Sequence, residues 1–151
     1  MTKLEIRALG EDLDESAELA EKLRAIKPAA PTDSKISIKP LLGTWVNCNR
    51  KTRGIVRIEF SERSGSLVVN VFGACHPSPC NWGKVPGTPY AESVVANEAI
   101  AFSGFYDHGF AECIVTGHLD FGTLVVESFT KFKDGSGRSN YYSRAYLCKS
   151  K

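Results

Sequence analysis

A succession of short extended segments, with a turn signal between nearly every pair, runs from Gly43 to Cys148 without an intervening helical stretch. Consecutive strands of this kind can bury their apolar faces in only a few ways, and the simplest is a closed up-and-down barrel. About eight segments can be counted, and a barrel of about eight strands is just wide enough to hold one small ligand. We therefore predict an all-β fold, a single up-and-down antiparallel β-barrel of about eight strands.

The strand pattern also predicts how the barrel closes. The expected strands are 41–48, 54–60, 67–71, 90–95, 99–106, 110–118, 121–132 and 138–148, with a Cys/Pro/Gly-rich loop over residues 73–89. In an up-and-down barrel the first and last strands pair, which removes the free edges. Residues 45–48 are then expected beside residues 141–148, where Cys48 and Cys148 become neighbours. A disulfide between them requires Cα atoms within about 7 Å.

The alternation within single strands defines two faces but does not identify the inner one. In residues 54–60, Val56, Ile58 and Phe60 share one face, and the other carries Ile55, Arg57 and Glu59. A register shift of one residue would exchange the two faces. The orientation of individual polar side chains therefore stays open at this point.

Residues 1–40 differ from residues 41–151, and we interpret them as a separate helical arm and linker. Residues 11–26 are rich in helix formers and place apolar side chains at roughly helical spacing, so they predict an amphipathic helix. Pro28 ends this helix, and residues 28–34 form a linker. The helix could cap one end of the barrel, bind a protein partner or be loosely attached.

Composition excludes some classes of protein. The chain has 151 residues, of which 42% are hydrophobic, so one packed domain is expected. The net charge of +2 is too small to indicate nucleic acid or a membrane surface as a partner. Acids outnumber bases in residues 1–34 and bases outnumber acids in the remainder, so the barrel could prefer anionic ligands.

The location predicted from the sequence is cytoplasmic. No apolar run reaches the ~18 residues that a membrane helix needs, and the charged N-terminus has no hydrophobic region of the secretory type. Five cysteines are an awkward number for a complete disulfide framework, and a reducing compartment would keep them as thiols.

Gly43-Thr44-Trp45 at the head of the first expected strand, followed by a meander of about eight strands that ends in an aromatic-rich strand, resembles the calycin group of small barrels. This group comprises lipocalins, fatty-acid-binding proteins and avidins, which open with a Gly-x-Trp segment whose Trp packs across one barrel end. The resemblance implies the barrel fold and a small-molecule ligand, without identifying it. Later lipocalin motifs and an avidin-like set of biotin contacts are absent from the chain.

A non-enzymatic small-molecule binding protein is the leading hypothesis, with a partly apolar ligand. Trp82 offers a flat apolar face and one hydrogen-bond donor at the edge of the loop, although it could equally pin that loop to the barrel. Inward-facing polar or aromatic side chains on the strands would add contacts, whereas outward-facing ones would meet solvent. The strand candidates are Arg57, Asn70, Tyr142, Arg144 and Tyr146.

The segment Cys75-His76-Pro77-Ser78-Pro79-Cys80 has four interpretations. It could be a stiffened structural loop, a lid that contacts the ligand, a metal site or a redox pair. Cys75, His76 and Cys80 could bind zinc, but a fourth ligand would have to come from another strand. The structural loop, which could contain a disulfide, is the interpretation we favour.

Two further functions stay open. The first is a cofactor-free isomerase or cyclase, for which Glu112, Glu127, Tyr142 and His118 are the candidate acid/base groups. The second is a protein-interaction domain with a filled core that docks through the N-terminal helix. No phosphate-loop, dinucleotide or metalloprotease motif is present, so no cofactor is expected.

Overall fold

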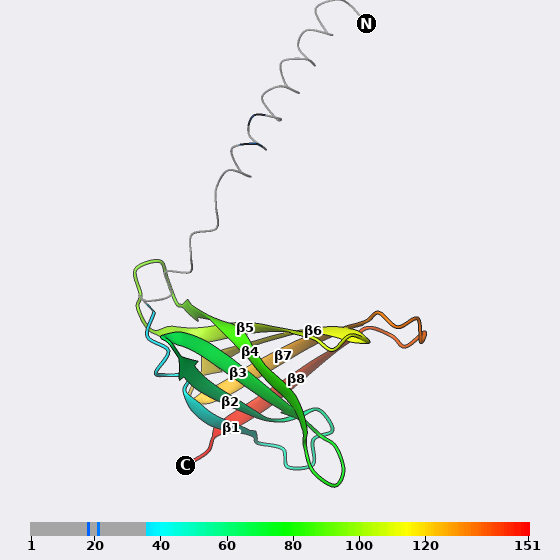
Figure 1. The fold of residues 1–151 in the computed structure, drawn as a ribbon. Helices are drawn as coiled ribbons and strands as arrows, with labels where there is room; N and C mark the ends of the chain where they lie inside the picture. The colour runs from blue at the N-terminus through cyan, green and yellow to red at the C-terminus, as the bar shows by residue number, and fades with distance from the viewer. Residues whose placement is uncertain (1–17, 19–20, 22–35) are drawn as a thin grey trace, which may run out of the picture. The chain divides into compact units, whose positions relative to one another are not determined.

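Residues 36–151 form a closed antiparallel barrel of eight strands, as predicted (Figure 1). The computed structural model describes these residues together with Glu18 and Glu21. The strands are β1 Gly43–Asn47, β2 Ile55–Arg63, β3 Ser66–Gly73, β4 Cys80–Ala91, β5 Ala99–Asp107, β6 Ala111–Asp120, β7 Thr123–Phe132 and β8 Tyr141–Lys149. The predicted helix falls on residues 11–26, which lie outside the described part apart from Glu18 and Glu21. In the described part, no helix is long and apolar enough to span a membrane.

The first and last strands meet at a seam that a disulfide crosses. Strand β1 pairs with β8 through Val46 and Cys148, and the amide of Cys48 donates a hydrogen bond of 2.8 Å to the carbonyl of Tyr146. Cys48 and Cys148 are bonded, with their Cα atoms 5.6 Å apart. The predicted pairing of the first and last strands is therefore confirmed.

A second disulfide joins Cys75 to Cys80, with Cα atoms 5.5 Å apart, across the turn between β3 and β4. Cys113 is the remaining cysteine and carries a buried free thiol. The odd count thus accommodates two disulfides and one thiol, a redox state that the sequence left open.

The expected loop over residues 73–89 is mostly a strand, so that prediction was wrong. Strand β4 begins at Cys80, and only residues 74–79 connect it to β3. Pro86 and Pro89 lie within it and pair with Val68 and Phe102 on the neighbouring strands. Proline and glycine locally disfavour a strand, but pairing on both sides within a closed barrel overrides this preference.

The predicted faces of residues 54–60 were also partly wrong. The pairing of β2 with β3 changes register between Ile55 and Arg57, which is a β-bulge. Ile55 is consequently buried together with Ile58 and Phe60, whereas Arg57 points outward. Strict alternation had placed Ile55 on the same face as Arg57.

One end of the barrel is closed by the segment that precedes β1. Ile38 and Leu41 are buried there, and the indole Nε1 of Trp45 donates a hydrogen bond of 2.8 Å to the carbonyl of Leu41. The ammonium of Lys149 lies 5.3 Å from the centre of the Trp45 ring. Trp45 therefore packs across one end of the barrel, as the resemblance implies.

Side chains fill the barrel from this closed end to its middle. The inward-facing core residues are Trp45, Ile58, Phe60, Leu67, Val69, Val71, Phe102, Val115, Leu124, Val126 and Leu147. Packing is tight enough that two positions require glycine: a Cβ at Gly117 would lie 2.5 Å from the Phe102 ring, and one at Gly87 would lie 2.6 Å from Val69. Space for a ligand is therefore left only toward the opposite end.

Candidate ligand-binding site

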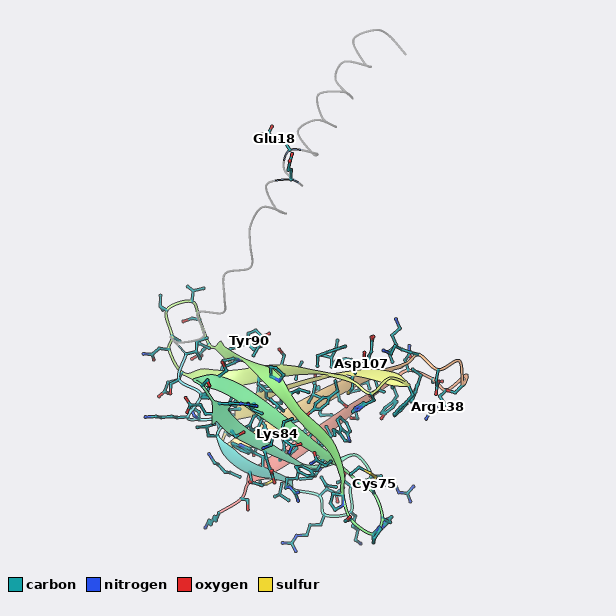
Figure 2. The ribbon with its side chains drawn as sticks, in the orientation of Figure 1. Glu18, Cys75, Lys84, Tyr90, Asp107 and Arg138 are labelled. Carbon is teal, nitrogen blue, oxygen red and sulfur yellow. A yellow bond between two sulfur atoms is a disulfide. The ribbon has the colours of Figure 1, made fainter. Side chains whose placement is uncertain are left out.

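The opposite end of the barrel, called the mouth here, is surrounded by four connections. Because successive strands run in opposite directions, the connections after β1, β3, β5 and β7 all emerge at this end. They are residues 48–54, 74–79, 108–110 and 133–140. In Figure 1 the yellow and orange connections project at one end of the ribbon, and Figure 2 labels Asp107 and Arg138 there.

Two adjoining hollows occupy the mouth. The aromatic hollow has a volume of about 380 Å³ and is lined by Cys80, Asn81, Trp82, His108, Phe110, Ala111, Cys113, Thr130, Phe132, Arg138 and Tyr141. The serine hollow has a volume of about 240 Å³ and is lined by Arg53, Gly54, Ile55, Gly73, Ala74, Cys75, Cys80, Trp82, Ser128, Tyr141 and Ser143. Cys80, Trp82 and Tyr141 line both hollows, so the two share a wall.

Tyr106 lies beneath the aromatic rings of the mouth, where the β3–β4 ladder is irregular. The register between these strands shifts near Val71. The Tyr106 hydroxyl accepts a hydrogen bond from the Val71 amide at 3.1 Å, and it can donate to the carbonyl of Gly83 at 2.9 Å or of Val69 at 3.2 Å. Burial raises the pKa of Tyr106 to about 12, against the opposing effect of the hydrogen bond from Val71. The neutral phenol of Tyr106 therefore forms hydrogen bonds with backbone groups of β3 and β4 at the point where the ladder is irregular.

Three aromatic rings are arranged above Tyr106. Trp82 meets Tyr106 edge to face with ring centres 5.6 Å apart, and His108 stacks on Tyr106 at 5.5 Å. His108 in turn stacks on Phe110 at 6.0 Å. A Cβ at Gly73 would lie 2.9 Å from the Trp82 indole nitrogen, so only glycine lets the indole lie this close to β3. These rings form an aromatic wall in the aromatic hollow, with the Trp82 ring nearly perpendicular to that of His108.

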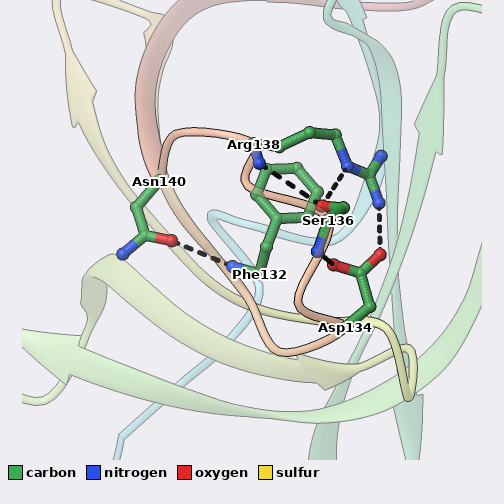
Figure 3. Close-up of polar contacts among 5 residues, drawn as sticks. All are labelled: Phe132, Asp134, Ser136, Arg138 and Asn140. Carbon is green, nitrogen blue, oxygen red and sulfur yellow. Dashed lines mark hydrogen bonds and ion pairs between the residues drawn. The ribbon is translucent and has the colours of Figure 1, made fainter.

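The β7–β8 connection places a cation beside this wall, and Figure 3 shows the contacts of Arg138 within that connection. Asp134 accepts hydrogen bonds from the Ser136 amide at 3.1 Å and from Arg138 Nη2 at 2.7 Å. Hydrogen bonds from Ser136, supported by Arg138, lower the pKa of Asp134 to about 2. The Arg138 guanidinium lies 4.1 Å from the centre of the Phe132 ring and 5.7 Å from that of Phe110.

Hydroxyl and thiol groups supply the polar part of the lining. The hydroxyls of Ser128 and Ser143 are 2.6 Å apart across β7 and β8, and either can donate. Cys113 accepts a hydrogen bond of 3.5 Å from the Thr130 hydroxyl, and burial raises the pKa of its thiol. The thiol is therefore protonated at neutral pH. The two serine hydroxyls line the serine hollow together with Arg53.

Basic residues dominate the four connections at the mouth. They carry five basic side chains, Arg50, Lys51, Arg53, Lys133 and Arg138, and a single acid, Asp134. Lys133 is held by Asp107 at 2.8 Å and by Glu112 at 3.3 Å. No ion pair is found for Arg53 in residues 36–151, and Arg53 lines the serine hollow. The four connections therefore carry an excess of positive charge.

The predicted ligand contacts fall into two groups. Trp82 lies between the two hollows. The strand candidates Arg57, Tyr142, Arg144 and Tyr146 point outward instead, and Arg57 stacks on Phe72 at 3.9 Å.

Asn70 is the fifth strand candidate and takes an outward position opposite Glu59 and Lys84, where it is nevertheless only 6% exposed. Its carbonyl oxygen has no hydrogen-bond partner within the described residues. Asn70 and the four outward-facing candidates are therefore separate from the mouth, and a role for them in binding stays a prediction.

The candidate acid/base groups also lie outside the two hollows of the mouth. Glu127 accepts a hydrogen bond of 3.1 Å from Tyr142 on the outer face, and His118 is exposed on β6. Glu112 pairs with Lys133 on the outer face. No carboxylate lines either hollow in the described part of the chain. The arrangement that would favour an isomerase, a carboxylate in an apolar pocket, is therefore not found in these two hollows of the described residues.

The second disulfide removes two of the three candidate metal ligands. Cys75 and Cys80 are bonded to each other, so neither offers a thiolate to zinc. Over the described residues, no group of three or more His, Cys, Asp or Glu side chains is placed to hold a metal ion. The segment from Cys75 to Cys80 therefore has the form of a cross-linked turn, which is the interpretation we favoured.

Sequence reasoning missed several residues of the mouth, namely His108, Phe110, Tyr141, Ser128 and Ser143. A signal for two of them was present in β8, where Tyr141 and Ser143 share a face with Ala145 and Leu147. Because that apolar face is the inner one, it carries Tyr141 and Ser143 into the mouth. Comparison of the chain with protein-family models, with curated proteins and with solved structures gives no match.

Proposed function

We propose that the barrel mouth binds a small, flat, partly apolar molecule that carries a negative charge. The observation that carries this proposal is the aromatic hollow, about 380 Å³ in volume, in which Trp82, His108 and Phe110 form a wall beside Arg138. Ligand sites are typically concave and apolar, with a few polar groups that set the orientation. The filled core limits the ligand to the mouth, so it enters the barrel only part of the way.

The lining suggests how such a ligand is held. A planar ring would lie against Trp82 and His108, since stacked or edge-to-face aromatic contacts each contribute about 0.5–1.5 kcal/mol beyond burial. Acceptor atoms on the ligand would meet the indole nitrogen of Trp82 and the paired hydroxyls of Ser128 and Ser143. Arg53 at the rim of the serine hollow would attract the negative charge.

A fluorescent probe of matching chemistry tests the proposal. We expect 1-anilinonaphthalene-8-sulfonate to bind at one site with enhanced fluorescence, and the neutral analogue N-phenyl-1-naphthylamine to bind more weakly. Trp82→Ala should weaken binding of the sulfonate about tenfold or more, equivalent to about 1.4 kcal/mol. Arg53→Gln should weaken the sulfonate and leave the neutral probe unchanged. Tyr90→Ala is the matched control, because Tyr90 is an exposed aromatic residue of β4 that lines neither hollow.

The same variants give the result that would contradict the proposal. If Trp82→Ala and Arg53→Gln bind the sulfonate as tightly as the unaltered protein does, the probe lies elsewhere and the mouth is not its site. Circular dichroism of each variant shows whether the barrel is intact, so that loss of binding can be separated from loss of folding. A protein that binds neither probe and gains no thermal stability from either would also refute the proposal.

The two disulfides are relevant to the cellular compartment of the protein. The sequence alone predicted a cytoplasmic location, and that location stays a prediction. Bonds from Cys48 to Cys148 and from Cys75 to Cys80 favour an oxidising compartment instead, because cytosolic thiol systems reduce structural disulfides. Trapping the thiols with an alkylating agent in cell extracts prepared under denaturing conditions distinguishes the two locations: one modified cysteine indicates the oxidised form, and five indicate the reduced form.

A further inference from the structure

An apolar row crosses the outer face of the barrel close to the mouth. Phe105 of β5 pairs in register with Ile114 of β6, Ile114 with Phe129 of β7, and Phe129 with Tyr142 of β8. Each of the four side chains is between 46% and 51% exposed. We call these four residues the outer apolar row.

Such a row is unusual at outward positions of a closed barrel. Outward residues of an antiparallel sheet are ordinarily polar, and single exposed apolar residues need no explanation. Here four large apolar side chains are adjacent, and they line a shallow hollow of about 380 Å³ on the outer surface. A contiguous exposed apolar surface of this kind marks an interaction site.

The row is held rigidly from one side. Phe129 contacts Tyr142 with ring centres 5.3 Å apart. The Tyr142 hydroxyl donates to Glu127 at 3.1 Å and accepts a hydrogen bond of 3.1 Å from Arg144 Nε. Hydrogen bonds to Tyr146 and Tyr142 raise the pKa of Arg144, so its charge is permanent. Because Tyr142 is fixed before any partner arrives, less side-chain entropy is lost on association.

We propose that the outer apolar row is a dimer interface on which a second copy of this chain packs, sheet face against sheet face. The face complements itself, which favours a second copy as its partner. We place a two-fold axis in the interface, parallel to the strands and above the line between β6 and β7. Each outward residue of β6 then lies opposite the residue of the partner's β7 that pairs with it in register. Ile114 then faces the partner's Phe129, and Phe105 faces the partner's Tyr142.

The same axis matches the charges of the neighbouring row. Glu112 and Lys131 pair in register on β6 and β7, one row toward the mouth. Under the two-fold axis Glu112 faces the partner's Lys131, and this contact is made twice. Lys131 forms no ion pair within residues 36–151, so its charge is open to a partner. Apolar contacts in the centre with opposite charges at the rim are the ordinary composition of a protein interface.

Sedimentation equilibrium of the full chain tests this proposal. We expect a monomer–dimer equilibrium at roughly 100 μM protein or below, within the range of weak specific interfaces. Ile114→Lys and Phe129→Lys should each raise the dimer dissociation constant at least tenfold, because a lysine would be buried against an apolar side chain. Phe121→Lys is the matched control, since Phe121 is fully exposed in the turn between β6 and β7 and lies outside the row.

A charge exchange tests the axis itself. Glu112→Lys should weaken the dimer, because it places two lysines opposite each other, and the double variant with Lys131→Glu should recover most of the loss. A chain that is monomeric at roughly 100 μM overturns the proposal. A dimer that persists in both Ile114→Lys and Phe129→Lys overturns it as well, because its interface then lies on another face. Failure to recover association in the double variant rejects the proposed axis.

Discussion

Removal of the disulfide at the barrel seam should destabilise the protein more than any other single cross-link change. The double variant Cys48→Ala/Cys148→Ala eliminates a bond between residues separated by 100 positions. In the chain-entropy account of cross-links, closing a loop of about 100 residues in the unfolded chain is worth about 4.7 kcal/mol at 25 °C. Both cysteines are exposed, so their replacement by alanine costs little packing.

The second disulfide provides the matched comparison. Cys75 and Cys80 are separated by only 5 positions, for which the same relation predicts about 2 kcal/mol. The two double variants differ in loop length while sharing the same chemical change. We therefore expect the seam variant to lose about 4–5 kcal/mol of unfolding free energy and the turn variant about 2 kcal/mol.

Equilibrium unfolding in urea, followed by tryptophan fluorescence and by far-ultraviolet circular dichroism, measures both values. The slope of the free energy against urea should also rise in the seam variant, because its unfolded chain is less compact. Equal losses in the two variants, or a larger loss in the turn variant, would show that loop length does not govern these bonds.

Hydrogen exchange gives a local version of the same prediction. The β1–β8 ladder has three paired positions, whereas the β6–β7 ladder has ten. With so short a ladder, the seam depends on the disulfide between Cys48 and Cys148 to stay closed. Amides of β1 and β8 should therefore exchange faster in the seam variant, while those of β6 and β7 follow the global stability. Uniform acceleration along the barrel would contradict this.

The buried residues Cys113, Tyr106 and Gly117 offer further tests. Unfolded protein that has not been reduced should react with one equivalent of a thiol reagent, at Cys113, and the native protein should react far more slowly because that thiol is buried. Tyr106→Phe should cost about 1–3 kcal/mol, measured by urea unfolding, because backbone groups of β3 and β4 lose their partner. Burial raises the pKa of Tyr106 in the folded protein to about 12, above its value of about 10 in the unfolded chain. The resulting contribution to stability is complete below about pH 10 and is lost between about pH 10 and 12. The Tyr106→Phe variant should not show this loss of stability. Gly117→Ala should cost about 1–3 kcal/mol in the same assay, because its Cβ would press on the Phe102 ring.

Much of the fold could be predicted from local pattern. The turn signals and the period of two predicted the number of strands and their order, and the removal of free edges predicted the pairing of β1 with β8. Two local predictions failed because neighbours decided the outcome. Strand β4 forms despite Pro86 and Pro89 because it is paired on both sides, and the bulge after Ile55 turns that side chain inward.

The candidate site was predicted only in part. Trp82 was named, because an indole beside prolines and cysteines suggested a mouth or a pinned loop. His108 and Ser128 were not named, because nothing in their immediate sequence distinguishes a residue of the barrel lining from one in a turn or on a strand surface. They become a site only when β5, β7 and the connection before β4 meet at the same end of the barrel.

The sequence by itself determined that this protein is a β-barrel, because alternating residues with frequent turns leave a chain few ways to bury its apolar side chains. The tertiary structure decided which face of each strand is the inner one, which cysteines are bonded and how far the core fills the barrel. The physical reason is that alternation is a property of a single strand, whereas inside and outside are set by the curvature that all eight strands adopt together.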